Sequence, residues 1–198
     1  MNNELYKFVE EQYVKNFGAM SGRACMQGSQ DERFPRKLDV YFWDPDDKTE
    51  LTTIATNGIS QMPFVKEDEY GKKVTHRGEL NFYVAGKLNK KNQNNLAEFI
   101  ANFSLVPFSD NKPLMYWNSY GFTGTVPEFP TCPAIVLHPP FSEEGWAMMD
   151  YKDFQIFLFN IVPLTKEEHN ILILNNTTNP ENLVKYLEKN KTNIFKGR

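Results

Sequence analysis

The chain has 198 residues, of which 40% are hydrophobic, 14% aromatic and 24% charged, a composition typical of a globular domain and not of a disordered chain. Its 22 basic and 25 acidic residues leave a net charge of −3, so no overall attraction to nucleic acid or to an anionic membrane is expected. Two cysteines cannot form a disulfide framework or a four-thiolate zinc site. No signal-peptide pattern begins the chain, and no apolar run reaches the roughly 20 residues of a membrane span, which together predict a cytoplasmic protein.

The first quarter of the chain predicts a helix, a loop and a hairpin. Residues 5–17 carry apolar side chains at helical spacing, which predicts an amphipathic helix that ends at Gly18. Residues 18–36 contain three glycines and no sustained period, so they predict a loop. Two runs rich in aromatic and β-branched residues follow at 38–43 and 51–56. The Asp-Pro-Asp-Asp turn between these runs predicts a β-hairpin.

The middle of the chain predicts one strand, one helix and a long loop. After the polar stretch 66–75, residues 79–84 alternate between apolar and polar, the pattern of a half-buried strand. Apolar residues at helical spacing over 96–106 predict a second amphipathic helix, which Pro107 terminates. Residues 107–133 are aromatic and rich in Pro and Gly, so they predict a long ordered loop or short edge strands.

The C-terminal third predicts the centre of a sheet. Residues 134–137 form a short apolar strand that ends at His138, before two prolines. Residues 154–162 are apolar on both faces, as in a strand that is covered on both sides. We therefore expect this second strand to lie in the middle of the sheet.

Two helices are expected after this strand. Residues 165–168 have the spacing of a capping box, which predicts a helix beginning at Lys166. The asparagines at 175–176 end this helix, and Asn-Pro at 179–180 starts another. Strands and helices are mixed without a regular βαβ alternation. The predicted fold is therefore α+β, a mixed and mostly antiparallel sheet with flanking helices, in a single domain over residues 1–198.

Charge is distributed unevenly along the chain. Between residues 39 and 69, eight acidic residues face two lysines, a local charge of −6, whereas the tail from 185 to 198 carries +4 and is expected to fray into solvent. Acidic loops are most often simply solvated. They also fit a docking face for a basic protein, because complementary charge raises the association rate. The residues that we predict for such a face are Asp44, Asp46, Asp47, Glu50, Glu67, Asp68 and Glu69.

The residue types that carry catalysis are scattered. The three histidines, His76, His138 and His169, lack the spacing of a metal site, so neither a metal nor another cofactor is expected. His138 precedes a proline and is expected to make a fixed hydrogen bond, whereas His169 is expected to be exposed. Cys132 would lie roughly 20 Å from His138 along an extended strand, too far for a nucleophile pair. Phosphate-binding glycine motifs and a hydrolase nucleophile elbow are absent.

One constellation leaves an enzymatic alternative open. Arg77 and Glu79 flank the start of a predicted strand, where a structural salt bridge is the favoured interpretation. The alternative is a small-molecule hydrolase or ligand-binding enzyme that uses Arg77, Glu79 and His138 in a pocket beneath the aromatic loop, which includes Trp117.

An ordered set of short stretches resembles the suppressor of fused domain family in its small bacterial form. The similarity is strongest over residues 50–185. The stretches are Thr56-Asn57-Gly58-Ile59-Ser60-Gln61-Met62-Pro63-Phe64, Arg77-Gly78-Glu79-Leu80, Leu137-His138-Pro139-Pro140-Phe141 and Phe157 to Val162 followed by Pro163-Leu164-Thr165-Lys166-Glu167-Glu168. The animal member is a larger regulatory protein with an additional C-terminal domain, for which this chain has no room.

The resemblance implies an α/β domain without enzymatic activity. For many bacterial members it also implies a role as an immunity protein that binds and neutralises a polymorphic toxin. The acidic segment fits this role, because toxin domains that act on nucleic acid are often basic. The expected partner is a cognate toxin or another basic protein, with no direct nucleic-acid or membrane ligand. A stand-alone regulatory scaffold without a toxin is the remaining alternative.

Overall fold

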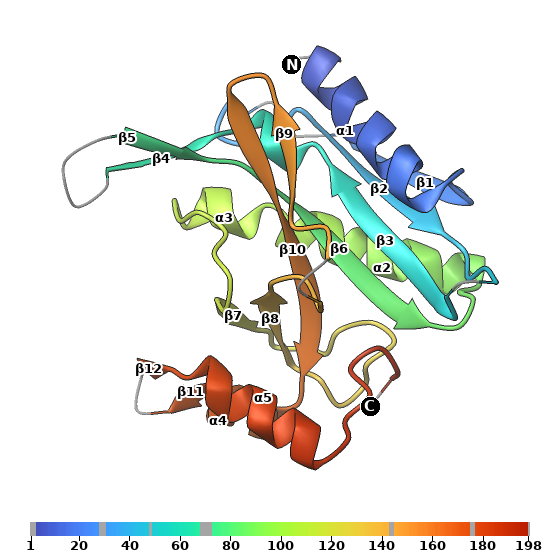
Figure 1. The fold of residues 1–198 in the computed structure, drawn as a ribbon, viewed down its shortest axis with the longest axis vertical. Coiled ribbons are helices and arrows are strands. Elements are labelled where there is room, and N and C mark those ends of the chain that lie inside the picture. Colours follow the sequence, from blue (N-terminus) through green and yellow to red (C-terminus); the bar gives the residue numbers. More distant parts are fainter. Residues whose placement is uncertain are drawn as a thin grey trace.

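The computed structural model describes residues 3–27, 31–47, 49–67, 73–142, 145–174 and 177–197. Its centre is an eight-stranded sheet with the order β1-β2-β3-β6-β10-β8-β7, in which β9 also pairs with β10 (Figure 1). Only the β6–β10 pair is parallel among the described strand pairs of this sheet. The strands are β1 Gly22–Gln27, β2 Lys37–Trp43, β3 Leu51–Asn57, β6 Gly78–Ala85, β7 Ser119–Gly121, β8 Ala134–His138, β9 Met148–Tyr151 and β10 Phe154–Leu164.

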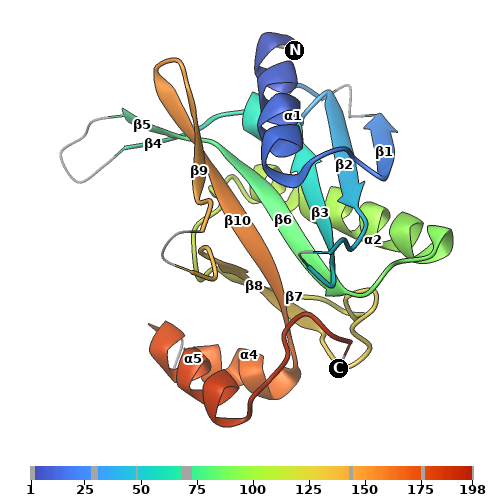
Figure 2. The same cartoon turned by 45° about the vertical axis from the view of Figure 1, so that its right-hand side comes forward.

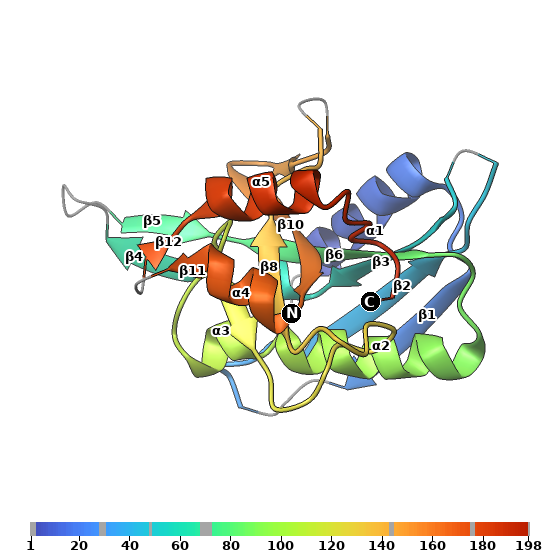
Figure 3. The ribbon, with the colours of Figure 1, turned by 90° about the horizontal axis from the view of Figure 1, so that it is seen from below.

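Helices cover both faces of this sheet, and two small hairpins lie outside it. In Figure 3, α2 lies on one side of the sheet, and α1 and α5 lie on the other. The helices are α1 Asn3–Phe17, the 3-10 turn η1 Ile59–Gln61, α2 Lys90–Phe103, α3 Val106–Ser109, α4 Lys166–Leu172 and α5 Pro180–Lys189. The small hairpins pair β4 Phe64–Glu67 with β5 Lys73–His76, and β11 Ile173–Leu174 with β12 Thr177–Thr178.

The strongest sequence patterns are confirmed. α1 ends before Gly18, whose φ of +81° suits glycine. β2 and β3 form the expected antiparallel hairpin, and β10 lies between β6 on one side and β8 and β9 on the other. The capping box is present, because Thr165 accepts from the backbone of Glu168 and Glu168 accepts from the backbone of Thr165. The α+β class and the mixed, largely antiparallel sheet are therefore as predicted.

Two hairpin or edge elements were not expected. The segment 18–36, which we predicted as a loop, contains β1. Only its alternate residues Ala24 and Met26 pack against the core, and two apolar residues are too few to show a period in the sequence. The polar stretch 66–75 contains the paired ends of β4 and β5, a hairpin that projects from the body in Figure 2. The ring of Phe64 at its base stacks on Phe108, with centroids 4.7 Å apart, so tertiary packing supports this otherwise polar hairpin.

Helix boundaries and the tail also differ from the predictions. α2 ends at Phe103, and Pro107 lies in the first turn of the separate α3, where its missing N–H costs nothing. α4 already ends at Leu172, whereas the predicted stop at 175–176 lies outside the described residues. The tail does not simply fray, because the backbone N–H of Ala85 donates to the carbonyl oxygen of Phe195 (2.7 Å).

Candidate functional site

The acidic residues that we predicted as one docking face occupy two places. Asp44, Asp46, Asp47 and Glu50 lie in the connection from β2 to β3, which we call the acidic turn. Asp46, Asp47 and Glu50 are exposed. Asp44 is partly buried and pairs with Lys87 at 2.7 Å. The acidic turn is thus a solvent-facing surface that carries negative charge.

The other predicted acids do not extend this surface. Glu67 ends β4, and Asp68 and Glu69 lie outside the described residues. The acidic turn lies before the first residue of β3, whereas β4 comes after the last residue of β3. The acidic turn and Glu67 are therefore separated by the length of this seven-residue strand (Figure 1). Among the predicted acids within the described residues, the exposed ones that share one turn are Asp46, Asp47 and Glu50.

Glu79 is fully buried and holds the chain reversal that follows β3. Its Oε1 accepts hydrogen bonds from the backbone N–H groups of Gly58 (3.0 Å) and Ser60 (2.9 Å), and its Oε2 accepts from the Thr56 hydroxyl (2.7 Å). Burial raises the pKa of the Glu79 carboxyl, whereas these hydrogen bonds lower it. At Gly58, φ is +143° and a Cβ would lie 2.3 Å from the Lys37 carbonyl oxygen. These contacts indicate a structural role.

Arg77 stabilises the same reversal from outside, and the predicted salt bridge with Glu79 is wrong. Arg77 Nη1 donates to the carbonyl oxygen of Ser60 (2.5 Å), and its guanidinium lies 4.4 Å from the ring centre of Phe154. Burial lowers the pKa of Arg77. The two side chains act on the same backbone segment without pairing, because the backbone donors at residues 58 and 60 already occupy Oε1 of Glu79.

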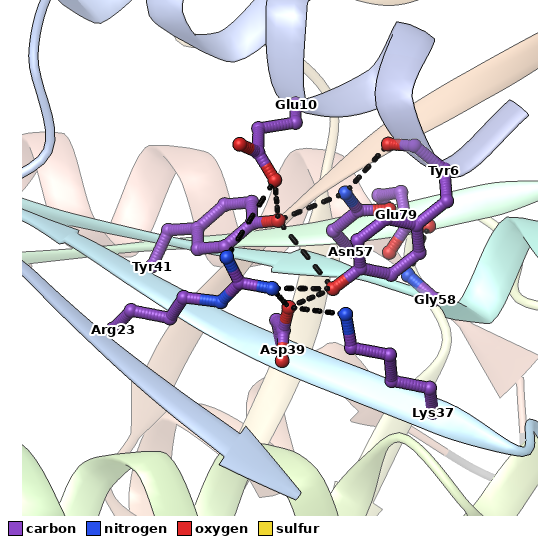
Figure 4. A network of polar contacts seen from close by, with 9 residues as sticks. All are labelled: Tyr6, Glu10, Arg23, Lys37, Asp39, Tyr41, Asn57, Gly58 and Glu79. Carbon is purple, nitrogen blue, oxygen red and sulfur yellow. Dashed lines mark hydrogen bonds and ion pairs between the residues drawn. The ribbon is translucent and has the colours of Figure 1, made fainter. Parts of the chain in front are cut away.

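A second buried carboxylate, Asp39 on β2, joins the sheet to α1 (Figure 4). Its Oδ2 accepts from the Tyr6 hydroxyl and from Arg23, and it lies 3.4 Å from Lys37 Nζ. The two cations balance its charge. Sequence reasoning counted Asp39 among the acids of a charged loop segment. Asp39 lies within a run of aromatic and β-branched residues that predicts a strand, and this pattern could have indicated that Asp39 is buried.

The same network continues along α1. The Tyr41 hydroxyl donates to Glu10 (2.7 Å), and Asn57 Nδ2 donates to the Tyr41 hydroxyl (3.0 Å) and to the Tyr6 carbonyl oxygen (2.9 Å). In Figure 4 these groups lie between α1 and the strands below it. Directional contacts therefore fix one position of α1 on the sheet.

His138 is held by a local hydrogen bond, as predicted. Its Nδ1 lies 2.6 Å from the Pro139 carbonyl oxygen, so Nδ1 carries the donated proton. The ring packs edge-on against Trp117 at 4.7 Å and stacks on Phe141 at 5.0 Å. Burial lowers the pKa of His138. His169 is half-buried rather than exposed, with Nε2 3.2 Å from the Ser119 hydroxyl.

The enzymatic constellation is not assembled. His138 lies on β8 and Glu79 on β6, with β10 between them, so two interstrand spacings, about 10 Å in all, separate their backbones. Arg77 lines a cavity of about 10 Å³ beside His76, which neither Glu79 nor His138 lines. Trp117 packs against His138 and not against the other two residues. The Glu79 carboxyl is engaged by Gly58, Ser60 and Thr56, and His138 Nδ1 by Pro139, so these two side chains are held by different partners and not by each other.

Within the described ranges, no three His, Cys, Asp or Glu side chains lie close enough together to hold a metal ion. Cys132 is buried in the core. None of the helices in the part of the chain that the structure describes is both long enough and apolar enough to cross a bilayer.

A larger cavity lies on the sheet face that carries α1. It has a volume of about 260 Å³. We call it the aromatic cavity, because five of its lining residues are aromatic. The lining residues are Phe17, Leu51, Tyr83, Pro140, Phe141, Ser142, Gly145, Trp146, Asn160 and Phe195. No local sequence pattern pointed to it, because its walls come from both ends and the middle of the chain.

These features define an α+β domain with buried polar contacts of structural type, an exposed acidic turn and an aromatic cavity. The family model for suppressor of fused protein (SUFU) matches residues 35–197, and the chain belongs to this family. The stretches at 56–60 and 77–79 that carry the family resemblance are the ones that Glu79 and Arg77 hold together.

Solved structures share the fold at low sequence identity. A SUFU homologue from Neisseria gonorrhoeae FA 1090 has a TM-score of 0.66 and 14% identity, over 98% of this chain and 93% of that one. A chain of the Sufu–Fu complex has a TM-score of 0.57 and 12% identity, over 97% of this chain and 96% of that one. Drosophila Suppressor of Fused has a TM-score of 0.53 and 13% identity, and this chain covers 54% of it. No curated protein sequence matches the chain.

Proposed function

We propose that this chain is a non-enzymatic protein-binding domain that acts as an immunity protein: it binds a cognate bacterial polymorphic toxin and neutralises it. Membership of the suppressor of fused family carries this proposal. One solved relative is a Sufu–Fu complex, which supports protein binding as the general activity of the fold. The separation of Arg77, Glu79 and His138 favours binding over catalysis.

The acidic turn is the surface that we assign to the toxin. Asp46, Asp47 and Glu50 are exposed at one end of the sheet. A basic toxin domain presents a positive substrate-binding surface. An acidic surface both steers the encounter with such a domain and covers the substrate site after docking. We further propose that the chain acts in the cytoplasm, that its partner is a basic protein, and that it binds no nucleic acid directly.

The test is co-purification with the product of a neighbouring reading frame and rescue of cells that express it. We expect a stable complex and restored growth. In a triple variant, Asp46→Asn, Asp47→Asn and Glu50→Gln, the association rate at low salt should fall about tenfold, because steering is lost. Asp44 is kept because it pairs with Lys87.

A matched control removes the same charge elsewhere. Glu98, Glu188 and Asp110 are exposed outside the acidic turn, and their replacement by Gln, Gln and Asn changes the net charge equally. This control should bind the toxin at nearly the original rate. Equal loss in both variants would overturn the assignment of the acidic turn, and no complex with any adjacent gene product would overturn the immunity role.

A further inference from the structure

The aromatic cavity is walled by rings from distant parts of the chain. Phe17 at the end of α1 and Trp146 before β9 form one wall, with ring centroids 5.7 Å apart. Phe141 and Phe195 form another at 5.2 Å, and Tyr83 lies 5.9 Å from Phe141. These residues are only partly buried, and Phe141 is 41% exposed. The rings are therefore open to a group that enters from solvent.

The polar atoms of the cavity are suited to a donor. None of its ten described lining residues is charged. Asn160 on β10 uses its Nδ2 to donate to the Pro139 carbonyl oxygen (2.9 Å), so its Oδ1 is the amide atom free to accept. The hydroxyls of Ser142 and Tyr83 can either donate or accept, so they are compatible with a donor ligand. The Oδ1 of Asn160 is the lining group whose role as an acceptor is fixed, and it suits a ligand with N–H donors.

The acidic turn adjoins the cavity. Glu50 precedes the lining residue Leu51, and its carbonyl oxygen accepts from the backbone N–H of Gly86 (2.8 Å), next to the strand that carries Tyr83. Glu50 is exposed next to the lining residue Leu51, and Asp46 and Asp47 are exposed in the same turn, so the turn brings negative charge to the Leu51 side of the cavity. Negative charge and the faces of aromatic rings both attract a cation and disfavour an anion.

We propose that the aromatic cavity receives an arginine side chain of the protein partner, an inference that rests on the proposed protein-binding function. A planar guanidinium stacks on aromatic rings, carries five N–H donors and is weakly hydrated, whereas a lysine ammonium is compact and strongly hydrated. A water molecule needs about 10–15 Å³ of such space. The cavity of about 260 Å³ therefore has room for a long side chain. Arginine is also a residue that basic surfaces supply.

The test is a titration with short peptides followed by NMR. The chain has three tryptophans, and the indole N–H signal of Trp146 can be assigned with a Trp146→Phe variant. The probes are acetylated Gly-X-Gly amides with X as Arg, Lys, Trp or Leu. We expect the Arg peptide to shift the Trp146 signal to saturation and the Lys peptide to bind at least about fivefold more weakly, in the range of a cation–π contact. The Trp117 indole, whose ring packs against His138 and does not line the cavity, should shift less than the Trp146 signal.

Variants separate the cavity from nonspecific charge effects. Phe141→Ala removes an exposed wall and should weaken Arg-peptide binding about fivefold or more without loss of folding. Leu174→Ala, a 51% exposed apolar residue outside the cavity, should leave it unchanged. Tighter binding of the Trp or Leu peptide, no saturable shift, or equal loss in both variants would overturn the arginine assignment. Because no toxin is used, a toxin complex that persists after such a result leaves the immunity role intact.

Discussion

On the face of the sheet that α2 covers, apolar side chains such as Leu80, Phe82 and Ile100 form the largest part of the core. On the face that α1 covers, the sheet buries the carboxylates of Asp39 and Glu79 together with the amide of Asn81. Apolar burial is strong but non-directional. Hydrogen bonds and ion pairs instead require one geometry. The α2 face thus buries the larger apolar cluster. The α1 face buries a second apolar cluster, which includes Tyr13 and Leu158, and adds directional contacts that fix the positions of particular segments.

The candidate binding surface lies on the α1 face. Next to the polar network that seats α1, the same face opens into the aromatic cavity, where Phe17 of α1 is one wall. The contacts of Tyr6 and Tyr41 with the sheet and with α1 therefore hold one wall of the aromatic cavity in place. We infer that the polar contacts of this face stabilise the fold and also keep Phe17 in the position that the proposed binding at the aromatic cavity requires.

The largest expected effect tests the α2 face. Phe82→Ala removes a ring that is 1% exposed and packs 5.6 Å from the ring of Phe129. The free energy of unfolding should fall by about 3–5 kcal/mol, because the lost contacts leave a cavity. Urea unfolding measures this change. As a control, Val65→Ala at a 59% exposed site should change the free energy by less than about 0.5 kcal/mol. A loss below about 1 kcal/mol for Phe82→Ala would show that the α2 face is not the main source of stability.

The next effect tests the buried carboxylate of the α1 face. Glu79→Gln keeps the shape of the side chain but replaces one acceptor oxygen with a donor amide beside backbone N–H groups. The free energy of unfolding should fall by about 1–3 kcal/mol, because a hydrogen-bond acceptor is lost in a fully buried site. The backbone amides of Gly58 and Ser60, which donate hydrogen bonds to Glu79 in the original chain, should exchange their hydrogens faster in the variant.

The matched control is an exposed glutamate. Glu98→Gln lies on the solvent side of α2 and should leave stability and exchange unchanged. If Glu79→Gln were as stable as the original chain, the carboxylate would not hold the reversal after β3, and its burial would need another explanation.

The sequence predicted elements whose signals are local. The capping box at Thr165 and Glu168 spans four residues, and the apolar run of β10 is continuous, so both could be identified without tertiary information. β1 could not, because only Ala24 and Met26 face the core. β4 and β5 are supported by pairing and by the stacking of Phe64 on a helix residue 44 positions away.

The candidate site was less predictable for the same reason. Glu79 meets its backbone partners 19 and 21 residues earlier only because β3 pairs with β6. The walls of the aromatic cavity range from Phe17 to Phe195, and no local spacing links them. The count of charged residues identified the acidic turn. It could not show that Asp39, which the same count included, is buried and forms an ion pair with Arg23.

A smaller effect tests the contacts that seat α1. Tyr41→Phe removes the donor hydroxyl and Glu10→Ala removes the acceptor, so each breaks the 2.7 Å hydrogen bond between the Tyr41 hydroxyl and Glu10. The double-mutant cycle should give a coupling of about 1 kcal/mol, the net value of one part-buried hydrogen bond. Both variants should also speed hydrogen exchange within α1.

A neighbouring exposed pair provides the reference for this cycle. Lys7 and Glu11 lie 3.6 Å apart on the solvent side of α1. Replacing them should give a coupling of no more than about 0.5 kcal/mol. Equal couplings for the two pairs would mean that the polar network adds nothing to the attachment of α1 beyond an ordinary surface contact.

The smallest effect concerns the pH dependence of stability near the aromatic cavity. Burial lowers the pKa of His138 from its usual value of 6.5, so the unfolded chain takes up this proton at a higher pH than the folded chain. The free energy of unfolding should therefore decrease as the pH falls through 6.5 toward the folded-state pKa. His138→Gln cannot take up the proton, and its stability should fall less between pH 7 and pH 5. Thermal unfolding of both proteins measures the difference, in which the contribution of the half-buried His169 cancels. Identical slopes would show that the ring of His138, stacked on the cavity wall Phe141, is protonated as easily in the folded chain as in the unfolded one.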